Sequence, residues 1–329
     1  MKTQDKNKNN ESLAPVLIFC YNRVNHLQKM FEALNSLDEC CNTDLYIFVD
    51  GPKRIPDETK KVRLFVEEYI SARSSFRTTT IIKSPSNKGL AKSVIDGVNL
   101  VFETYDSVIV LEDDLIVSKD FLNYMNSALA FYRDNAAIDS ISGYVYNSKL
   151  MPCLKKLESD VFFALRGCSW GWGTWKNRWE SIKWNVSEMI PTSLNFAFRK
   201  AFSQWGLDLP YLLDSYYLGE SQSWAIRWVL NQYLFNRYTV YPAVSRIENI
   251  GIDGSGTNYK KTVDAYKTEV LAERTNTVFS DFYISRKIQK QFKKACLNYF
   301  WAFVLFTKFV FSKRRKIKKL IKMYHGENS

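Results

Sequence analysis

Histidine is scarce in this chain, and its cysteines lack the spacing of a metal site. The 329 residues include two histidines and six cysteines, none of which forms a C-x-x-C pair. Structural zinc sites need closely spaced cysteines and histidines, so the sequence predicts none. Irregular cysteine spacing in a chain of this length favours reduced thiols and a cytosolic compartment over a disulfide-stapled secreted protein.

Long apolar runs are also missing. The N-terminal MKTQDKNKNNES is polar, so we expect no signal peptide and a disordered leader over residues 1–13. The apolar block at 298–311, NYFWAFVLFTKFVF, is interrupted by Lys308 and is shorter than the roughly 20 residues of a membrane-spanning helix. With 46% apolar and 15% aromatic residues, the chain still has ample material for a large buried core.

The main body of the chain has no excess of either charge. Thirteen of the 46 Lys and Arg residues, but only one of the 34 Asp and Glu residues, lie from Arg286 onward. The preceding part therefore holds 33 bases and 33 acids, and the net charge of +12 belongs to the C-terminal segment. A neutral body argues against nucleic-acid binding, which requires a basic face toward the phosphates.

Short apolar runs alternate with helical patterns in the first third of the chain. Predicted strands lie at 14–23, 45–50, 79–83 and 108–112, and predicted helices at 25–37, 57–72 and 86–102. Asn25 is a plausible N-cap of the first helix. The alternation predicts an α/β fold with right-handed crossovers and a mostly parallel, Rossmann-like sheet flanked by helices. Further helices are expected at 120–132, 194–205 and 223–235, whereas 138–184 is aromatic-rich and without a regular pattern.

No strong linker divides the chain before its basic end. We expect one catalytic domain over 14–275 and a basic, aromatic helical tail over 276–329. Bases that flank aromatic and aliphatic residues predict a helix lying on an anionic membrane surface. A helix docked on the domain with a solvated basic end is the alternative, and nucleic-acid binding by the tail is the least favoured.

The stretch VIVLEDDLIV places three consecutive carboxylates, Glu112, Asp113 and Asp114, directly after a predicted buried strand. Arg23 and Asp50 follow two other predicted strands in the same way. Ligands of parallel sheets bind outside the carboxyl ends of the strands, so we expect these residues to line one site. Clustered carboxylates without His or Cys suit Mg²⁺ or Mn²⁺, which usually bridge one or two carboxylates to the phosphates of a ligand. An acidic turn on a solvated edge is the alternative.

The order of several motifs resembles that of metal-dependent glycosyltransferases with the GT-A fold. FCYNR and FVDGP end the first two predicted strands, NKGLAKSVIDGV opens a helix, and VIVLEDDL follows. With SWGWGTWKNRW, SWAIRW and NIGIDGSG further along, the chain is similar over about 14–260 to the N-acetylglucosaminyltransferase I-like group and to bacterial family 2-type polysaccharide glycosyltransferases. The resemblance implies an inverting transfer from a nucleotide sugar, with a UDP-sugar favoured, aided by Mn²⁺ or Mg²⁺.

The resemblance also implies roles for individual residues. Arg23 and Asp50 match positions that contact the nucleotide, Asp50 at its base. Asp113 matches the acid near the ribose. Asp114 matches the direct metal ligand, and Glu112 matches a supporting position.

Two glycine-containing stretches are further candidates. In the loop at 251–256, Ser255 or backbone N–H groups are suited to bind a diphosphate, with a plain flexible turn as the alternative. Trp170, Trp172 and Trp175 alternate with small residues, which predicts a loop or extended segment rather than a helix. We expect their rings to face a sugar, with a plug in the local core as the alternative.

One position departs from the family pattern. An inverting enzyme needs a carboxylate that deprotonates the acceptor hydroxyl, and we expect it just before SWAIRW, where this chain has Gln222. An amide is not a useful base at neutral pH. Glu220 lies two residues earlier and Asp214 further back, and we predict that Glu220 is the base. For Trp224 and Trp228 within SWAIRW, the simplest expectation is a helix face packed on the core.

These observations predict a glycosyltransferase that extends a lipid-linked glycan of a bacterial surface polysaccharide at the cytoplasmic face of the cell membrane. A non-catalytic nucleotide-sugar-binding or scaffold protein, in which Gln222 marks a lost base, is one alternative. A nucleotidyltransferase also combines a parallel sheet with a carboxylate-bound metal. It would usually carry a Gly-rich phosphate loop after the first strand, whereas FCYNRVNHL contains no glycine.

Overall fold

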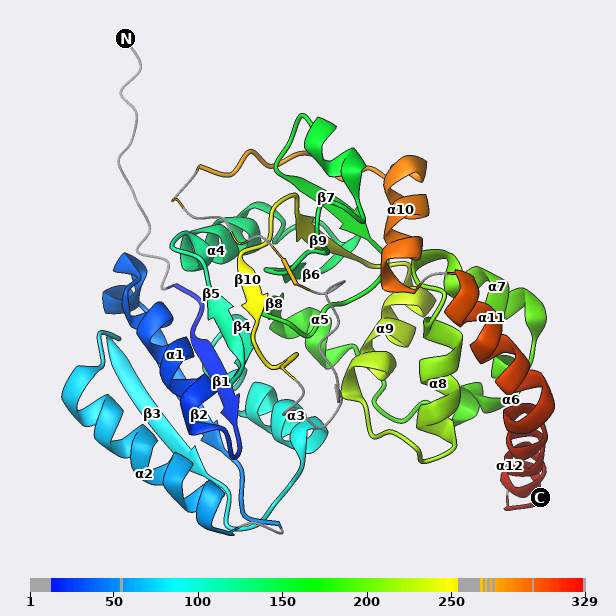
Figure 1. Ribbon diagram of the computed structural model, residues 1–329, viewed down its shortest axis with the longest axis horizontal. Helices are drawn as coiled ribbons and strands as arrows, with labels where there is room; N and C mark the ends of the chain where they lie inside the picture. Colours follow the sequence, from blue (N-terminus) through cyan, green and yellow to red (C-terminus); the bar gives the residue numbers. More distant parts are fainter. Residues whose placement is uncertain are drawn as a thin grey trace.

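The computed structural model describes residues 13–53, 56–253, 267, 268, 270, 273, 276–297 and 299–327. Within them, eight strands form one sheet. They are β1 (Val16–Cys20), β2 (Asp44–Val49), β3 (Thr78–Lys83), β4 (Ser107–Glu112), β6 (Ile138–Ser142), β7 (Val161–Ala164), β8 (Trp172–Trp175) and β9 (Tyr238–Pro242). A separate two-stranded sheet pairs β5 (Leu115–Val117) with β10 (Ile247–Asn249). Figure 1 shows the large sheet at the centre of the molecule, between helices.

The first four strands confirm the sequence prediction. The sheet order is β3-β2-β1-β4-β8-β6-β9-β7, and β3, β2, β1 and β4 run parallel to one another. All five residues of β1 are buried, as expected for a parallel strand covered by helices on both faces. The predicted α/β fold with a mostly parallel, helix-flanked sheet is therefore confirmed.

The second half of the sheet was not predicted, because residues 138–184 contain three strands instead of irregular structure. β8 pairs antiparallel with β4 and β6, and β7 pairs antiparallel with β9. β6 has the sequence IDSIS, which looks too polar for a buried strand, yet all five residues are buried. The Asp139 carboxylate within it accepts hydrogen bonds from Trp228 Nε1 at 2.8 Å and Gln232 Nε2 at 3.1 Å. These partners lie about 90 residues away, so the local pattern gave no sign of them.

Helices cover both faces of the sheet. One face packs against α1 (Val24–Asn35), α2 (Pro56–Arg73) and α4 (Phe121–Phe131). The other face packs against α3 (Leu90–Val101), α5 (Lys176–Glu180) and α9 (Trp224–Phe235). Apolar residues of β1 and β4 alternate between the two clusters, as the period-2 geometry of a strand requires. The predicted N-cap was wrong: α1 starts at Val24, before Asn25, and Arg23 in the cap position makes no side-chain cap bond.

The tryptophans of the WGWGTW stretch belong mainly to the core. Trp172 and Trp175 lie in β8 and are 1% and 4% exposed, so the expectation that they face a sugar is wrong. The Trp172 ring lies 4.8 Å from that of Trp228 and 5.2 Å from that of Trp224, which confirms the core position of both α9 rings. Trp170 is half-buried against Tyr144, with 4.6 Å between ring centroids, and stays a candidate for ligand contact.

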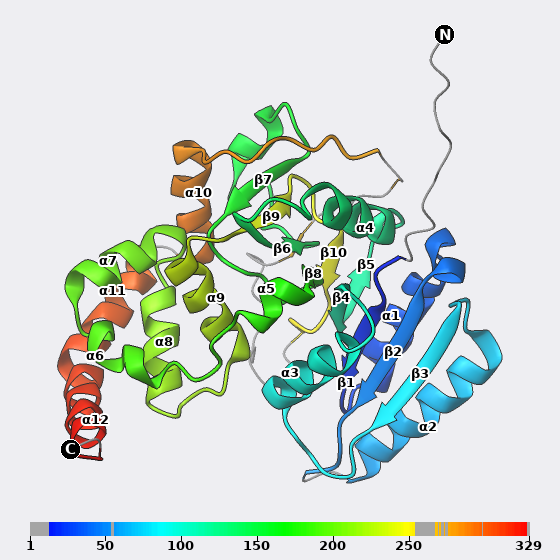
Figure 2. The same cartoon turned by 180° about the vertical axis from the view of Figure 1, so that it is seen from behind.

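The helices of the C-terminal half form a second packed region beside the sheet. Between β8 and β9 lie η3 (Ser187–Met189), α6 (Ile190–Ser193), α7 (Phe196–Phe202), η4 (Ser203–Trp205) and α8 (Leu209–Tyr217), besides α5 and α9. After residue 285 come α10 (Arg286–Cys296), α11 (Tyr299–Lys308), a π-helical turn (Phe309–Lys313) and α12 (Arg314–Glu327). Figures 1 and 2 show α10, α11 and α12 along the side of the molecule away from α2 and β3.

The C-terminal helices are anchored by buried apolar residues. Ile288 and Phe292 of α10 belong to a core cluster with β7 and η4, and Phe309 and Ile317 are fully buried. Among the described residues, no helix is long and apolar enough to span a membrane. The domain boundary after 275 stays a prediction, since residues 274 and 275 lie outside the described part.

Candidate functional site

Arg23 links the two aspartates that follow β4. Its Nη2 donates to Asp113 Oδ1 and to Asp114 Oδ2, each at 2.7 Å. The Tyr21 backbone N–H also donates to Asp113 Oδ2, at 3.2 Å. Because β1 and β4 are parallel neighbours, the residues after their last positions meet at one edge of the sheet. Three predicted site residues are thus in direct contact.

This edge of the sheet carries an excess of negative charge. Burial raises the pKa of Asp113, while the Arg23 guanidinium lowers it. Glu112 is the half-buried last residue of β4, and burial together with the two neighbouring aspartate charges raises its pKa to about 8. Even with Glu112 largely protonated at neutral pH, the carboxylates of Asp113 and Asp114 outnumber the one guanidinium of Arg23, which leaves room for a cationic ligand.

The loop after β10 begins directly against this cluster. The Ile250 N–H donates to the Asp114 carbonyl at 2.9 Å. A Cβ added to Gly251 would lie 2.0 Å from Asp114 Oδ2 and 2.9 Å from Arg23 Nη1, so a side chain would collide with the ion pair. Glycine is required here by the close approach of the backbone. Ser255 lies outside the described residues, and its predicted role in binding a diphosphate stays a prediction.

Asp50, which directly follows β2, is buried and accepts four hydrogen bonds. The N–H groups of Gly51 and Lys88 donate to Oδ1 at 2.7 and 2.8 Å. The Gly89 N–H and Asn87 Nδ2 donate to Oδ2 at 3.0 and 2.9 Å. A carboxylate has about four lone-pair sites, and all are used within the protein. Asp50 therefore orders the turn before α3, and its predicted contact with a nucleotide base would require the exchange of one of these bonds.

The acid cluster fits a cation that arrives with its ligand. Among the described residues, no group of three or more His, Cys, Asp and Glu side chains is arranged to hold a metal ion. Hydrogen bonds to the Asp114 carboxylate come, within the same residues, from Arg23 alone and reach Oδ2. Mg²⁺ and Mn²⁺ commonly bind one or two carboxylates and complete their coordination with phosphates and water. The oxygen donors of Asp114 and Glu112 suit this mode of binding.

Glu220 lies in the loop between α8 and α9 and is exposed. Its Oε2 accepts a hydrogen bond from Lys313 Nζ at 2.8 Å, and this bond with the Lys313 charge lowers the pKa of the Glu220 carboxyl. Trp224, four residues later, packs in the same core cluster as Phe19 of β1 and Val110 of β4. The loop therefore leads into a helix that packs beneath the two strands bearing the acid cluster. The role of Glu220 as base stays a prediction.

The other carboxylate considered as a base is unsuitable. Asp214 is fully buried in α8 and accepts hydrogen bonds from Arg199 Nη1 at 2.8 Å and Nη2 at 2.9 Å. Burial raises the pKa of Asp214, and the paired guanidinium lowers it. A carboxylate enclosed in this way cannot reach an acceptor. Gln222, by contrast, is exposed at the position where a base was expected.

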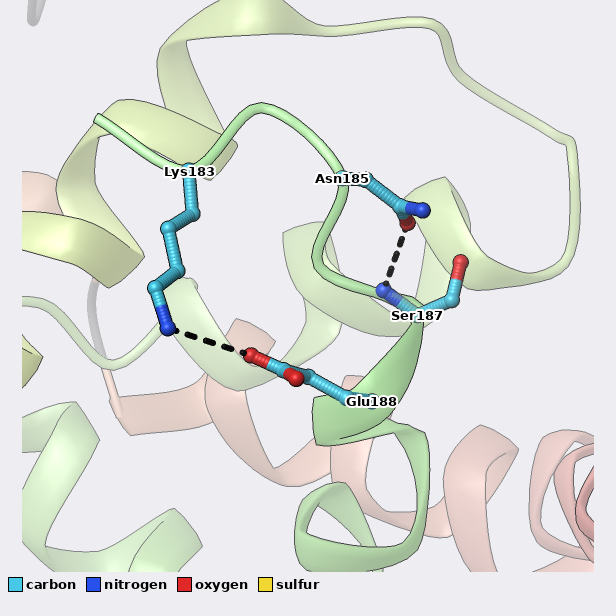
Figure 3. Close-up of a pocket in the computed structure, with 4 residues that line it drawn as sticks. All are labelled: Lys183, Asn185, Ser187 and Glu188. Atoms are coloured by element: carbon cyan, nitrogen blue, oxygen red, sulfur yellow. Dashed lines mark hydrogen bonds and ion pairs between the residues drawn. The ribbon is translucent and has the colours of Figure 1, made fainter. Parts of the chain in front are cut away.

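A surface pocket shown in Figure 3 contains none of the predicted site residues. It is lined by Lys183, Asn185, Ser187 and Glu188. Lys183 Nζ lies 3.7 Å from Glu188 Oε1, and the Ser187 N–H donates to Asn185 Oδ1 at 3.1 Å. Both charged side chains are largely exposed, so their attraction is screened and weak. The pocket offers no arrangement of catalytic groups.

Sequence reasoning missed the partners that hold the site residues. Lys313 is 93 residues from Glu220, and no local pattern connects them. The NKG tripeptide at 87–89 was placed at the start of a helix, but its bonds to Asp50 were not predicted. The charge run of the C-terminal segment was interpreted as a membrane-binding feature, and it gave no sign of the contact with Glu220.

Comparisons with known proteins identify a family. The model of "Glycosyl transferase family 2" matches residues 16–202. None of the curated proteins gives a significant match.

Two solved structures show distant similarity. One is the mannosyltransferase PcManGT from Pyrobaculum calidifontis in complex with GDP-Man and Mn²⁺, with 12% identity and a TM-score of 0.36 over 50% of this chain and 45% of that chain. The other is a cytidylyltransferase from Leptospira borgpetersenii serovar Hardjo-bovis, with 14% identity and a TM-score of 0.31 over 52% and 63%. The chain thus covers less than two thirds of either protein.

The family match confirms the predicted relationship to family 2 glycosyltransferases. It includes β1 with Arg23, β2 with Asp50 and β4 with the three acids, and it ends before Glu220. It favours sugar transfer over the nucleotidyl transfer that was weighed as an alternative. Because this match covers more than half of its 329 residues, the chain belongs to glycosyl transferase family 2, whose enzymes use nucleotide-sugar donors.

Proposed function

We propose that this chain transfers a sugar from a UDP-sugar to a hydroxyl of a lipid-linked glycan in surface polysaccharide synthesis, with inversion at the sugar carbon. The observation that carries the proposal is the cluster of Arg23, Asp113 and Asp114 at the carboxyl edge of a family 2 sheet. Its unbalanced negative charge suits a cation, and the positive Arg23 suits a phosphate. The choice of UDP rests on the resemblance of the LEDDL element to its counterparts.

In this proposal the residues at the carboxyl edge of the sheet each bind a different part of the nucleotide-sugar donor. Asp114 holds Mn²⁺ or Mg²⁺ with support from Glu112, Asp113 faces the ribose, and Arg23 and Asp50 contribute to nucleotide binding. When bound, the cation offsets the negative charge that develops on the departing diphosphate. Ser255, which lies outside the described residues, is proposed as a further donor to the phosphates.

Glu220 acts as the general base in the transfer. The acceptor oxygen attacks the anomeric carbon, and the bond from this carbon to the diphosphate oxygen breaks. Glu220 takes the proton of the acceptor hydroxyl, and the nucleoside diphosphate leaves with the bonding electron pair. Attack from the side opposite to the leaving group inverts the configuration. A positioned base of this kind typically contributes about 10²–10⁴-fold to the rate.

The C-terminal helices hold the enzyme at the inner face of the cell membrane. Phe303, Phe306 and Phe311 are 65%, 40% and 78% exposed on α11 and the turn that follows it. Exposed bases accompany them, namely Lys308, Arg315, Lys316, Lys318, Lys319 and Lys322. Between Arg286 and Lys322 the sequence contains no acid. An apolar strip bordered by bases is the pattern of a helix lying in an anionic lipid interface.

A nucleotide screen tests the proposal. Thermal unfolding is followed with UDP, GDP, dTDP and CMP, each with and without Mn²⁺, on the wild type and Asp114→Asn. UDP with Mn²⁺ should stabilise the wild type by about 2.7 kcal/mol at 100 times its dissociation constant, and the variant should lose this effect. Absence of stabilisation by every nucleotide would contradict the donor site.

A second candidate function is a nucleotide-sugar-binding or scaffold protein without activity, favoured by the amide of Gln222 at the expected base position. The nucleotide screen is expected to give the same result for both candidate functions, because both bind the nucleotide. Release of UDP from a UDP-sugar distinguishes the two, because only the enzyme turns the donor over.

A further inference from the structure

The C-terminal segment contacts the proposed base directly. Lys313, the last residue of the π-helical turn, places its Nζ 2.8 Å from Glu220 Oε2 and 2.8 Å from Ser215 Oγ of α8. The Glu220 side chain is 42% exposed and that of Lys313 is 21% exposed, so the ammonium is the more enclosed partner. The pair joins α8 and its following loop to a segment 93 residues later in the chain.

This contact belongs to a packed face of the segment. Phe309, four residues before Lys313, is fully buried, and its ring lies 3.6 Å from the Arg199 guanidinium. Arg199 in turn holds Asp214 of α8 through two hydrogen bonds. Ile317, four residues after Lys313, is also fully buried. Residues spaced by four lie on one side of a helix, so a single inner face carries both apolar anchors and the lysine.

The charged surroundings of Glu220 come from two elements. Lys313 and, more weakly, Lys316 supply positive charge from the C-terminal segment. Ser215 of α8 donates a hydrogen bond, and Asp214 behind it is neutralised by Arg199. Of Lys313, Lys316 and Ser215, Lys313 has the largest effect on the pKa of the Glu220 carboxyl. Its removal should therefore change the charge and hydrogen bonding around Glu220 more than removal of either of the others.

We propose that Lys313 is a positioning residue for the base Glu220, so that the C-terminal segment completes the acceptor side of the site. The inference rests on the proposed function, which makes Glu220 the base. By holding Oε2, the ammonium fixes the carboxylate and leaves Oε1 to accept the proton of the acceptor hydroxyl. The same segment carries the proposed membrane face, and the base is thus ordered only when the C-terminal helices are docked on α6 to α8.

The test compares pH profiles of donor hydrolysis, in which water replaces the acceptor hydroxyl and release of UDP from the UDP-sugar is measured. The full chain is used as wild type, Lys313→Met, Lys313→Arg, Glu220→Gln and Lys60→Met. Lys313→Met should lower kcat roughly 10- to 100-fold, the scale for loss of one hydrogen bond to a charged group, with the KM for donor unchanged. Its acid limb should move to higher pH, because Lys313 lowers the pKa of Glu220 and the base must be ionised.

The other variants separate positioning from packing. Lys313→Arg keeps a charged donor and should restore most of kcat and the wild-type acid limb. Lys60→Met removes one exposed charge of α2, away from both proposed sites, and should behave as wild type. The inference would be overturned if Glu220→Gln is inactive but the acid limb of the Lys313→Met pH profile does not move. Lys313 would then only help to hold the C-terminal helices in place. Full hydrolysis by Glu220→Gln would instead overturn the base assignment of the proposed function, and this inference with it.

Discussion

Glu112 and Glu220 are the same residue type in two regions of the molecule, and their carboxyls are shifted in opposite directions. Burial and two neighbouring aspartates raise the pKa of Glu112 to about 8. Lys313 lowers the pKa of Glu220. At the donor edge three acids share one arginine, whereas near α8 each acid has its own base. In the proposed function, a bound cation supplies further positive charge to the donor edge. The region of Glu220 already receives positive charge from Lys313 of the C-terminal segment.

The two regions also differ in whether the family model matches them. The donor edge lies within residues 16–202, which match family 2, and its contacts join neighbouring strands of one sheet. Glu220, Lys313 and the helices around them lie after the matched part. The proposed donor site thus lies in the part of the chain that the family model matches, and the proposed acceptor side lies beyond it.

The largest expected effect separates binding from chemistry. Glu220→Gln removes the proposed base and should lower sugar transfer about 10²–10⁴-fold, without weakening stabilisation by UDP and Mn²⁺. Release of UDP with an acceptor-containing lipid extract measures the loss. Gln222→Ala, at an exposed neighbour, serves as the control and should retain activity. Equal loss in both variants would mean that the loop, and not the carboxylate, matters.

The docking of the C-terminal helices should depend on one buried ring. Phe309→Ala removes a fully buried phenyl group over Arg199 and should lower the free energy of unfolding by about 3–5 kcal/mol. Phe311→Ala, two residues away and 78% exposed, should change it by less than about 0.5 kcal/mol. Urea denaturation of both variants gives the comparison, and similar values would show that the segment is not anchored at Phe309.

Lipid binding should depend on the outer face of the same helices. Replacement of Lys318 and Lys319 by Gln should weaken binding to anionic vesicles by roughly 30-fold, at about 1 kcal/mol for each base near the surface. The matched control replaces the exposed pair Lys60 and Lys61 on α2, on the opposite side of the molecule in Figures 1 and 2. Vesicle co-sedimentation measures both, and an equal loss in the control would contradict an oriented membrane face.

The smallest effect concerns a carboxylate at the opposite end of β2. Asp44 is buried and accepts hydrogen bonds from Arg77, Thr78 and Tyr105, and the Arg77 bond in particular lowers its pKa. Its contribution to stability is present above the unfolded pKa of about 3.9 and is lost as pH falls through the lower folded pKa. The gap in urea midpoint between wild type and Asp44→Asn should therefore narrow below about pH 4. A constant gap would show that charge is not the cause.

The sequence predicted the donor half of the molecule better than the rest. Strands β1, β2 and β4 were visible because each is a short apolar run that is largely buried, and the order of β1 and β4 brought Arg23 to Asp113 and Asp114. β6 was not visible, because IDSIS is buried through partners distant in sequence, such as Trp228 for Asp139. The WGTW stretch of β8 was predicted only as a loop or extended segment. The link of Glu220 to Lys313 has the same origin, since only the packing of Phe309 and Ile317 brings the two together.

Calorimetric titration of UDP with Mn²⁺ into the wild type, Asp114→Asn and Glu220→Gln tests the separation of the two regions most directly. The account predicts that Asp114→Asn loses metal-dependent UDP binding and that Glu220→Gln binds as tightly as the wild type. Unchanged binding by Asp114→Asn, or lost binding by Glu220→Gln, would contradict the assignment of donor and acceptor chemistry to separate parts of the chain.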